Sequence, residues 1–102
     1  MYHMYMIDLD SIIGFEWDSA NRDKSYFKHG ITPNEAEEIF LDERGLLHED
    51  VKHSQHEQRY VLIGKTFNNK LLICIFTIRN LKVRVISVRK TDKQERRQYE
   101  KN

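Results

Sequence analysis

The 102-residue chain has a single cysteine, a single proline and four glycines. One cysteine cannot form an internal disulfide. Because Cys74 lies inside an apolar run, we interpret it as a small buried hydrophobe rather than a nucleophile. The sequence contains no glycine-rich phosphate loop, no paired-cysteine metal site and no serine elbow. We therefore expect neither a cofactor nor a resident metal ion.

Long apolar runs are also missing. No segment approaches the roughly 18 apolar residues that a membrane span needs. The N-terminal residues lack the basic segment that opens a secretion signal, and Asp8 and Asp10 interrupt their apolar character. Together with the unpaired cysteine, these features favour a protein of the reducing cytoplasm.

Charge is unevenly distributed along a chain whose net charge is only +1. Residues 1–58 contain 13 Asp and Glu against 5 Lys and Arg, whereas residues 79–102 contain 9 Lys and Arg against 3 Asp and Glu. A basic C-terminal third is typical of a surface that binds RNA, another polyanion or an acidic partner. A charged helix that is simply solvated is the alternative.

Capping residues predict two helices in the first half of the chain. Asp18 is a suitable N-cap for a helix over residues 19–27, which Gly30 would close with Lys28 and His29 in the last turn. Thr32-Pro33-Asn34-Glu35 is the pattern of a capping box and predicts a second helix to about Asp42. Before these helices, residues 5–13 could form an edge strand.

The second half changes to strand patterns and ends in a third helix. Strands are expected over residues 46–51, 59–67, 71–79 and 82–89, with Gly64 as a bulge, joined by turns at Asn68-Asn69 and Asn80-Leu81. Thr91 to Gln94 could be a capping box that opens a helix to about Lys101, a helix with only Tyr99 as an apolar anchor. Helices segregated from a three- or four-stranded antiparallel meander indicate an α+β fold in one domain over residues 1–102.

Three groups of side chains could carry chemistry. The like charge of Lys28 disfavours protonation of His29, so this imidazole could act as a base near pH 7. Arginines on strands can bind phosphates and stabilise the extra charge of a phosphorane, and the candidates are Arg59, Arg79, Arg84 and Arg89, with Lys90. Arg84 and Arg89 are five residues apart, so all the arginines cannot share a site unless the strand bulges or ends before Arg89. The last group, Asp50, His53 and His56, could hold a metal but is more often a solvated loop.

Several short pieces occur in an order and spacing that resemble the BrnT family of toxins from type II toxin–antitoxin systems. Those pieces are Phe15-Glu16-Trp17-Asp18, Lys28-His29-Gly30, Glu35-Ala36, residues 50–59, Ile63-Gly64, residues 71–79, residues 84–90 and residues 95–100. Residues 1–14 would be an N-terminal extension of this family's domain. The family usually has a lysine at the position of Asn21 and an asparagine at that of Ser25.

The resemblance implies a compact RelE-like domain that cleaves RNA without a metal and so inhibits translation. It also implies a BrnA-like antitoxin partner, a dimer or a heterotetramer with that antitoxin, and contact with operator DNA only through it. The implied catalytic residues are His29, Lys28, Arg59, Arg79, Arg84 and Arg89, and the implied binding residues are Lys90, Glu57, Arg96 and Arg97. A weak or inactive module that mainly binds an antitoxin is the alternative.

Overall fold

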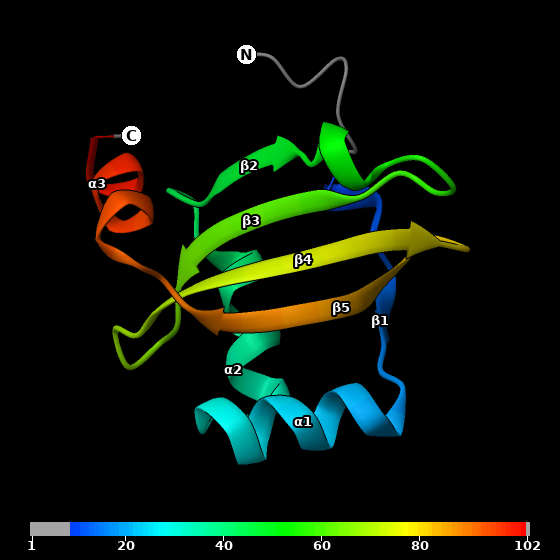
Figure 1. The fold of residues 1–102 in the computed structure, drawn as a ribbon, viewed down its shortest axis with the longest axis horizontal. Coiled ribbons are helices and arrows are strands. Elements are labelled where there is room, and N and C mark those ends of the chain that lie inside the picture. The colour runs from blue at the N-terminus through cyan, green and yellow to red at the C-terminus, as the bar shows by residue number, and fades with distance from the viewer. Residues whose placement is uncertain (1–8, 102) are drawn as a thin grey trace.

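A five-stranded sheet organises the molecule. The structure, a computed structural model, describes residues 9–101, with the backbone alone for Arg22 and residues 25–27. Figure 1 shows the sheet with α1 and α2 on one side of it and α3 at one end. The elements are β1 (Gly14–Glu16), α1 (Ser19–His29), α2 (Pro33–Glu38), β2 (Leu46–Glu49), β3 (Tyr60–Lys65), β4 (Leu71–Arg79), β5 (Lys82–Lys90) and α3 (Lys93–Lys101). No helix among these is long and apolar enough to cross a membrane.

The sheet is mixed, with strand order β1-β5-β4-β3-β2. Strands β2 to β5 form the expected antiparallel meander, but β1 adds a fifth strand parallel to β5, with Phe15 opposite Val83. The prediction of three or four antiparallel strands was therefore wrong. The strand expected over residues 5–13 begins outside the described residues, and its described part contains a 3-10 turn at Leu9–Ser11.

The two helices before β2 follow their capping residues. Helix α1 has Lys28 and His29 in its last turn, as expected, and Gly30 then takes a positive φ of 67°. Thr32 and Glu35 form the reciprocal capping box of α2. The helix tightens into a 3-10 turn at Ile39–Leu41, so it ends earlier than the expected Asp42.

The main core lies between the sheet and α2. Ile31, Ala36 and Ile39 pack there against the fully buried Phe76, and the T-shaped stack of Phe40 on Phe76 closes the layer. Gly64 was expected to form a bulge, but it lies in the regular register opposite Leu72. Glycine suits that position because an added Cβ would lie 2.8 Å from the carbonyl oxygen of Ile39.

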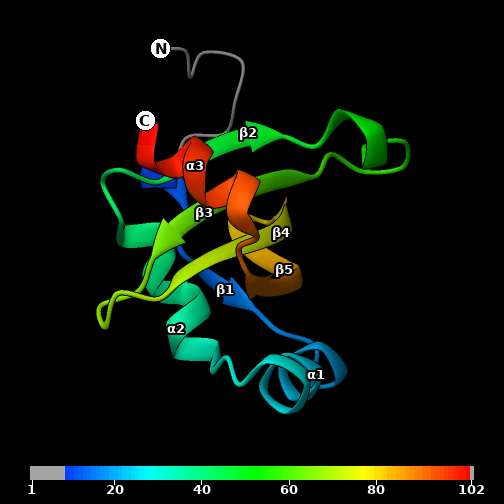
Figure 2. The ribbon, with the colours of Figure 1, turned by 60° about the vertical axis from the view of Figure 1, so that its left-hand side comes forward.

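Helix α3 packs on the other face of the sheet, over a second cluster formed by Ile63, Leu71 and Ile73 (Figure 2). Its buried anchor is Tyr99, whose hydroxyl donates a 2.6 Å hydrogen bond to Asp42 Oδ2. The helix begins one residue later than expected. Thr91 completes the strand ladder by bonding Leu71 O, so the capping box is formed by Asp92 and Glu95.

Candidate functional site

A β-bulge in β5 sets the positions of the arginines. Ile75 pairs with Ser87 and Phe76 with Val85, so Ile86 is an extra residue without a partner on β4. The bulge keeps Val85 and Val88 on the core side although they are three residues apart. Arg84 and Arg89 therefore share the opposite face of the sheet.

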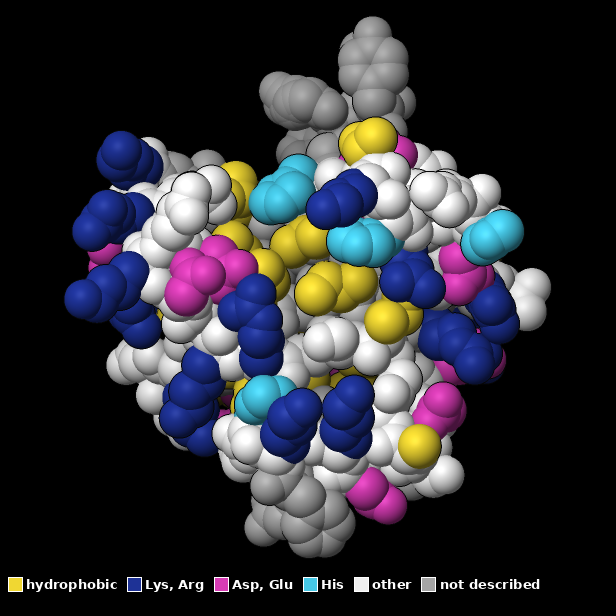
Figure 3. Space-filling model, in the orientation of Figure 1, with side chains coloured by type: hydrophobic (Ala, Val, Ile, Leu, Met, Phe, Trp, Pro, Cys, Tyr) yellow, Lys and Arg dark blue, Asp and Glu magenta, His cyan; other side chains and the backbone are white. Residues whose placement is uncertain are grey.

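We call this opposite face, away from α2, the open face. Arg79, Arg84 and Arg89 lie on it, because their positions on β4 and β5 are in step with Ile73, which packs under α3. Figure 3 shows this side of the molecule, with apolar side chains near the centre and Lys, Arg and His side chains around them. Such a surface offers an apolar floor for bases and a cationic rim for phosphates.

Arg89 meets Lys28 and His29 at one end of the open face. These three residues and Lys90 line a cavity of about 350 Å³, although the two segments are some 60 positions apart in the sequence. Arg89 is also held by a bidentate pair with Glu95, with N–O distances of 2.9 and 2.8 Å. The hydrogen bond from Arg89 lowers the pKa of Glu95, and the same bond raises the pKa of Arg89.

Arg79 lies at the other end of the open face. With His53, His56, Glu57 and Arg59 it lines a cavity of about 250 Å³. Arg79 donates from Nε and Nη2 to Glu57 Oε2, at 3.2 and 2.9 Å. Because Arg89 is paired with Ile73, six residues before Arg79, the two arginines are roughly 20 Å apart along the strands.

The structure thus divides the predicted site into two parts. Lys28, His29, Arg89 and Lys90 form one cluster, and Glu57, Arg59 and Arg79 belong to the other. Arg84 lies between them, and its side chain forms no hydrogen bond or ion pair with the described part of the chain. Arg96 and Arg97 are exposed on α3 and line neither cavity.

Asn21, unassigned by the sequence, has a structural contact. Its side-chain nitrogen donates a 3.2 Å hydrogen bond to Val85 O, next to the bulge, and so attaches α1 to the edge of β5. The bulge was named from the sequence only as a condition for Arg84 and Arg89 to share a face, and its position was not predicted. The valines at positions 83, 85 and 88 carry the signal, since their spacing changes from two to three within one strand.

His53 was considered above only as a metal ligand. Its Nδ1 lies 3.0 and 3.1 Å from the two carboxylate oxygens of Asp50. Among residues 9–101, no three His, Cys, Asp or Glu side chains are arranged to hold a metal ion. In this loop the Asp50 carboxylate instead orients the His53 imidazole.

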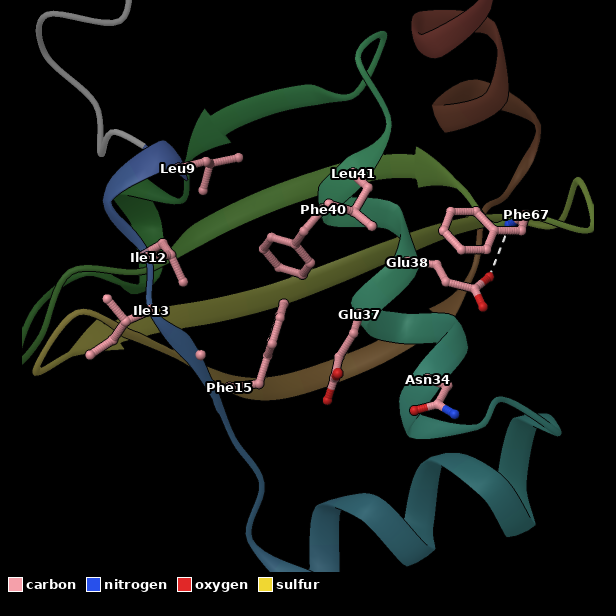
Figure 4. A pocket seen from close by; sticks show the side chains of 11 residues that line it. Leu9, Ile12, Ile13, Phe15, Asn34, Glu37, Glu38, Phe40, Leu41 and Phe67 are labelled. Atoms are coloured by element: carbon pink, nitrogen blue, oxygen red, sulfur yellow. Dashed lines mark hydrogen bonds between the residues drawn. The ribbon is translucent and has the colours of Figure 1, made fainter.

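A third cavity, of about 510 Å³, lies between α2 and the segment from Leu9 to Phe15 (Figure 4). Its lining is mainly apolar and includes no Lys, Arg or His. Its two carboxylates are engaged locally: Glu37 accepts from Trp17 Nε1, and Glu38 accepts from the backbone N–H of Phe67. This cavity lacks the cations that a phosphate needs, and both of its carboxylates are engaged in these hydrogen bonds.

A small α+β domain whose sheet presents arginines and histidines around an apolar floor has the features of an RNA-binding or RNA-cleaving protein. The comparisons with known proteins specify the family. Residues 17–95 match the family model described as the ribonuclease toxin BrnT of type II toxin–antitoxin systems, and the chain belongs to this family. The family pairs its toxin with an antitoxin.

One solved structure similar to this chain is the crystal structure of the Brucella abortus ribonuclease toxin BrnT. The two share 23% sequence identity with a TM-score of 0.62, over 79% of this chain and 99% of the Brucella chain. This likeness concerns the fold. No curated protein matches the sequence.

Proposed function

We propose that this chain is an endoribonuclease toxin that binds single-stranded RNA along the open face and cleaves it without a metal ion. The observation that carries the proposal is the row of Arg79, Arg84 and Arg89 on one face over a distance of roughly 20 Å, in which the bulge at Ile86 brings Arg89 to the same face as Arg84. A row of this kind suits an extended phosphate backbone better than a single small anion.

The chemistry needs only side chains that the open face carries. A neutral imidazole removes the proton of a ribose 2′-OH, and the resulting oxyanion attacks the adjacent phosphate. Guanidinium groups bind the phosphate oxygens in pairs and stabilise the additional negative charge of the phosphorane. His29, beside Lys28, Arg89 and Lys90, is the base proposed from the sequence, and the exposed Arg96 and Arg97 on α3 are proposed to contact flanking phosphates.

Cleavage of labelled RNA by the purified chain in EDTA tests this function. We expect cutting that weakens as salt rises, and a loss of RNA affinity of about tenfold in Arg84→Ala, since this arginine has no protein partner to satisfy. Lys101→Ala, an exposed cation at the end of α3, is the matched control. RNA that stays intact after long incubation with folded protein would refute the proposal.

The antitoxin is expected to be BrnA-like and to cover the same basic face, giving a dimer or heterotetramer that contacts operator DNA only through the antitoxin. Growth arrest on expression of the chain alone, relieved by its antitoxin, is the corresponding test in cells.

A second candidate function is antitoxin binding with little or no catalysis. It is favoured by the two carboxylate pairs, Arg79 with Glu57 and Arg89 with Glu95, which occupy guanidinium donors that phosphates would need. This alternative requires tight antitoxin binding and normal growth when the chain is expressed alone.

A further inference from the structure

The loop between β2 and β3 is held in a defined shape by its own hydrogen bonds. Its base is closed by Asp50 N–H donating to Arg59 O at 2.8 Å. Inside the loop, the Ser54 hydroxyl donates to Asp50 O at 2.6 Å and accepts from Arg59 N–H at 3.0 Å. Thr77 Oγ1 also donates to Gln58 O at 2.7 Å, which attaches the loop to β4. The polar side chains of this loop are therefore presented by a braced backbone.

This loop and the end of β4 bring together two imidazoles, two guanidinium groups and one carboxylate around a single cavity. The Asp50 carboxylate engages Nδ1 of His53, which places the Nδ1 proton toward Asp50 and leaves Nε2 as the basic nitrogen. A base oriented by a third group is the arrangement that general-base catalysis uses. His56, three residues further on, lines the same cavity.

The cavity also contains the cations that a phosphate needs. Arg59 forms no side-chain hydrogen bond or ion pair with the described part of the chain, so its donors are available. Arg79 is oriented by Glu57 through Nε and Nη2, which leaves Nη1 free to donate.

His29 lacks these features. Lys28, Arg89 and Lys90 line its cavity with cations only, and none of the side chains that the structure describes forms a hydrogen bond with its imidazole. No carboxylate in the lining of that cavity orients the ring as Asp50 orients His53. The cluster around His29 is therefore suited to holding a phosphate, whereas the Asp50 loop has both halves of an acid–base system.

We propose that His53 and His56 are the catalytic base and acid of RNA cleavage, an inference that rests on the proposed ribonuclease function. His53 Nε2 takes the proton of the 2′-OH as the 2′-oxygen forms a bond to phosphorus. His56 gives a proton to the 5′-oxygen as the bond between phosphorus and that oxygen breaks. The products are a 2′,3′-cyclic phosphate and a 5′-hydroxyl end. Arg59 and Arg79 hold the phosphate, and Asp50 is a positioning residue.

Single-turnover cleavage of an RNA oligonucleotide tests this assignment. We expect His53→Ala and His56→Ala each to lower the rate at least a hundredfold with RNA affinity little changed. His53→Gln, which keeps a donor toward Asp50, should fold normally and be equally slow. Asp50→Asn should lower the maximal rate without changing affinity. The control is His48→Ala on β2, with no expected effect, and His29→Ala should weaken RNA binding rather than the maximal rate.

A second substrate distinguishes the role of His53 as the base from that of His56 as the acid. An RNA with a bridging sulfur in place of the 5′-oxygen at the cleaved bond has a leaving group that needs no proton. It should restore the rate of His56→Ala to within about tenfold of the unmodified protein, while His53→Ala stays slow.

Full cleavage by His53→Ala or His56→Ala would overturn this assignment but not the ribonuclease function. The same holds if His29→Ala is the one histidine variant that loses the maximal rate. If the unmodified chain cuts no RNA, the ribonuclease proposal fails together with it.

Discussion

Replacing Tyr99 by phenylalanine should remove the hydrogen bond that anchors α3 to the rest of the domain. Tyr99 is only 8% exposed, and its hydroxyl donates to Asp42 Oδ2 at 2.6 Å. A hydrogen bond to a charged group contributes about 1.5–3 kcal/mol. We therefore expect Tyr99→Phe to lower the free energy of unfolding by about 2 kcal/mol at pH 7, a large part of the stability of a domain this small.

The free energy of unfolding should depend on pH through both Asp42 and Tyr99. Burial raises the pKa of Asp42, but hydrogen bonds from Tyr99 and from the backbone N–H groups of Lys65 and Arg44 outweigh it, so the pKa is lowered overall. The stability from Asp42 is then present above the unfolded-state pKa of about 3.9 and is lost as pH falls through the folded value. Burial and then Asp42 raise the pKa of Tyr99 to about 12, so its contribution is complete below about pH 10 and is lost between there and about pH 12.

Urea unfolding followed by circular dichroism measures both effects. Tyr60→Phe is the matched control, because Tyr60 is equally buried but its hydroxyl bonds to no residue in the described part of the chain. The difference between Tyr99→Phe and the unmodified protein should shrink below about pH 4. The stability loss above about pH 10 should be smaller in Tyr99→Phe, which keeps only the part due to Tyr60, whose pKa burial also raises. If both phenylalanine variants cost the same at pH 7, the reasoning about Asp42 is wrong.

Three further predictions use other contacts. Glu95→Gln keeps the α3 cap but removes the charge beside Arg89, so RNA affinity in a filter-binding assay should rise. The loss of stability should stay below about 1 kcal/mol, because the Arg89 side chain is 39% exposed. This loss should vanish in acid, because a carboxylate whose pKa is lowered by folding stabilises the protein only above its unfolded-state pKa of about 4.3. Unchanged or weaker RNA binding would contradict this. Gly64→Ala should cost about 1–3 kcal/mol in urea unfolding, because its Cβ would meet Ile39 O at 2.8 Å, whereas Gly14→Ala, with open space, should cost almost nothing. Cys74 is fully buried and burial raises its pKa, so alkylation by iodoacetamide should occur only on unfolding, and fast labelling of the native protein would disprove its burial.

Local chemistry made the element assignments predictable. The Thr32–Glu35 capping box, Gly30 and the apolar run of β4 are short-range signals, and each element lies where these residues place it. The start of α3 was displaced by one residue because Thr91 bonds Leu71, a contact across 20 positions that local pattern does not reveal.

The sheet and the site depended on contacts distant in sequence. The pairing of β1 with β5 joins segments nearly 70 residues apart, and a three-residue strand carries little pattern of its own. Likewise, no sequence spacing could show that Lys28 and His29 meet Arg89, or that His53 and His56 share a cavity with Arg59 and Arg79. The arginines could be named from the sequence, but their division into two clusters could not.

Ile86, the extra residue in β5, also bears on which sequence changes the fold can accept during evolution. Beyond Arg84 the strand has no neighbour on the β1 side among the described residues, and Asn21 of α1 bonds Val85 there instead. Deleting Ile86 would leave a regular strand with Val88 and Arg89 still on their present faces. The residues after the bulge would also keep their partners on β4, so Arg89 would remain opposite Ile73. A single-codon deletion could thus remove the bulge while leaving both the core and the cationic row intact.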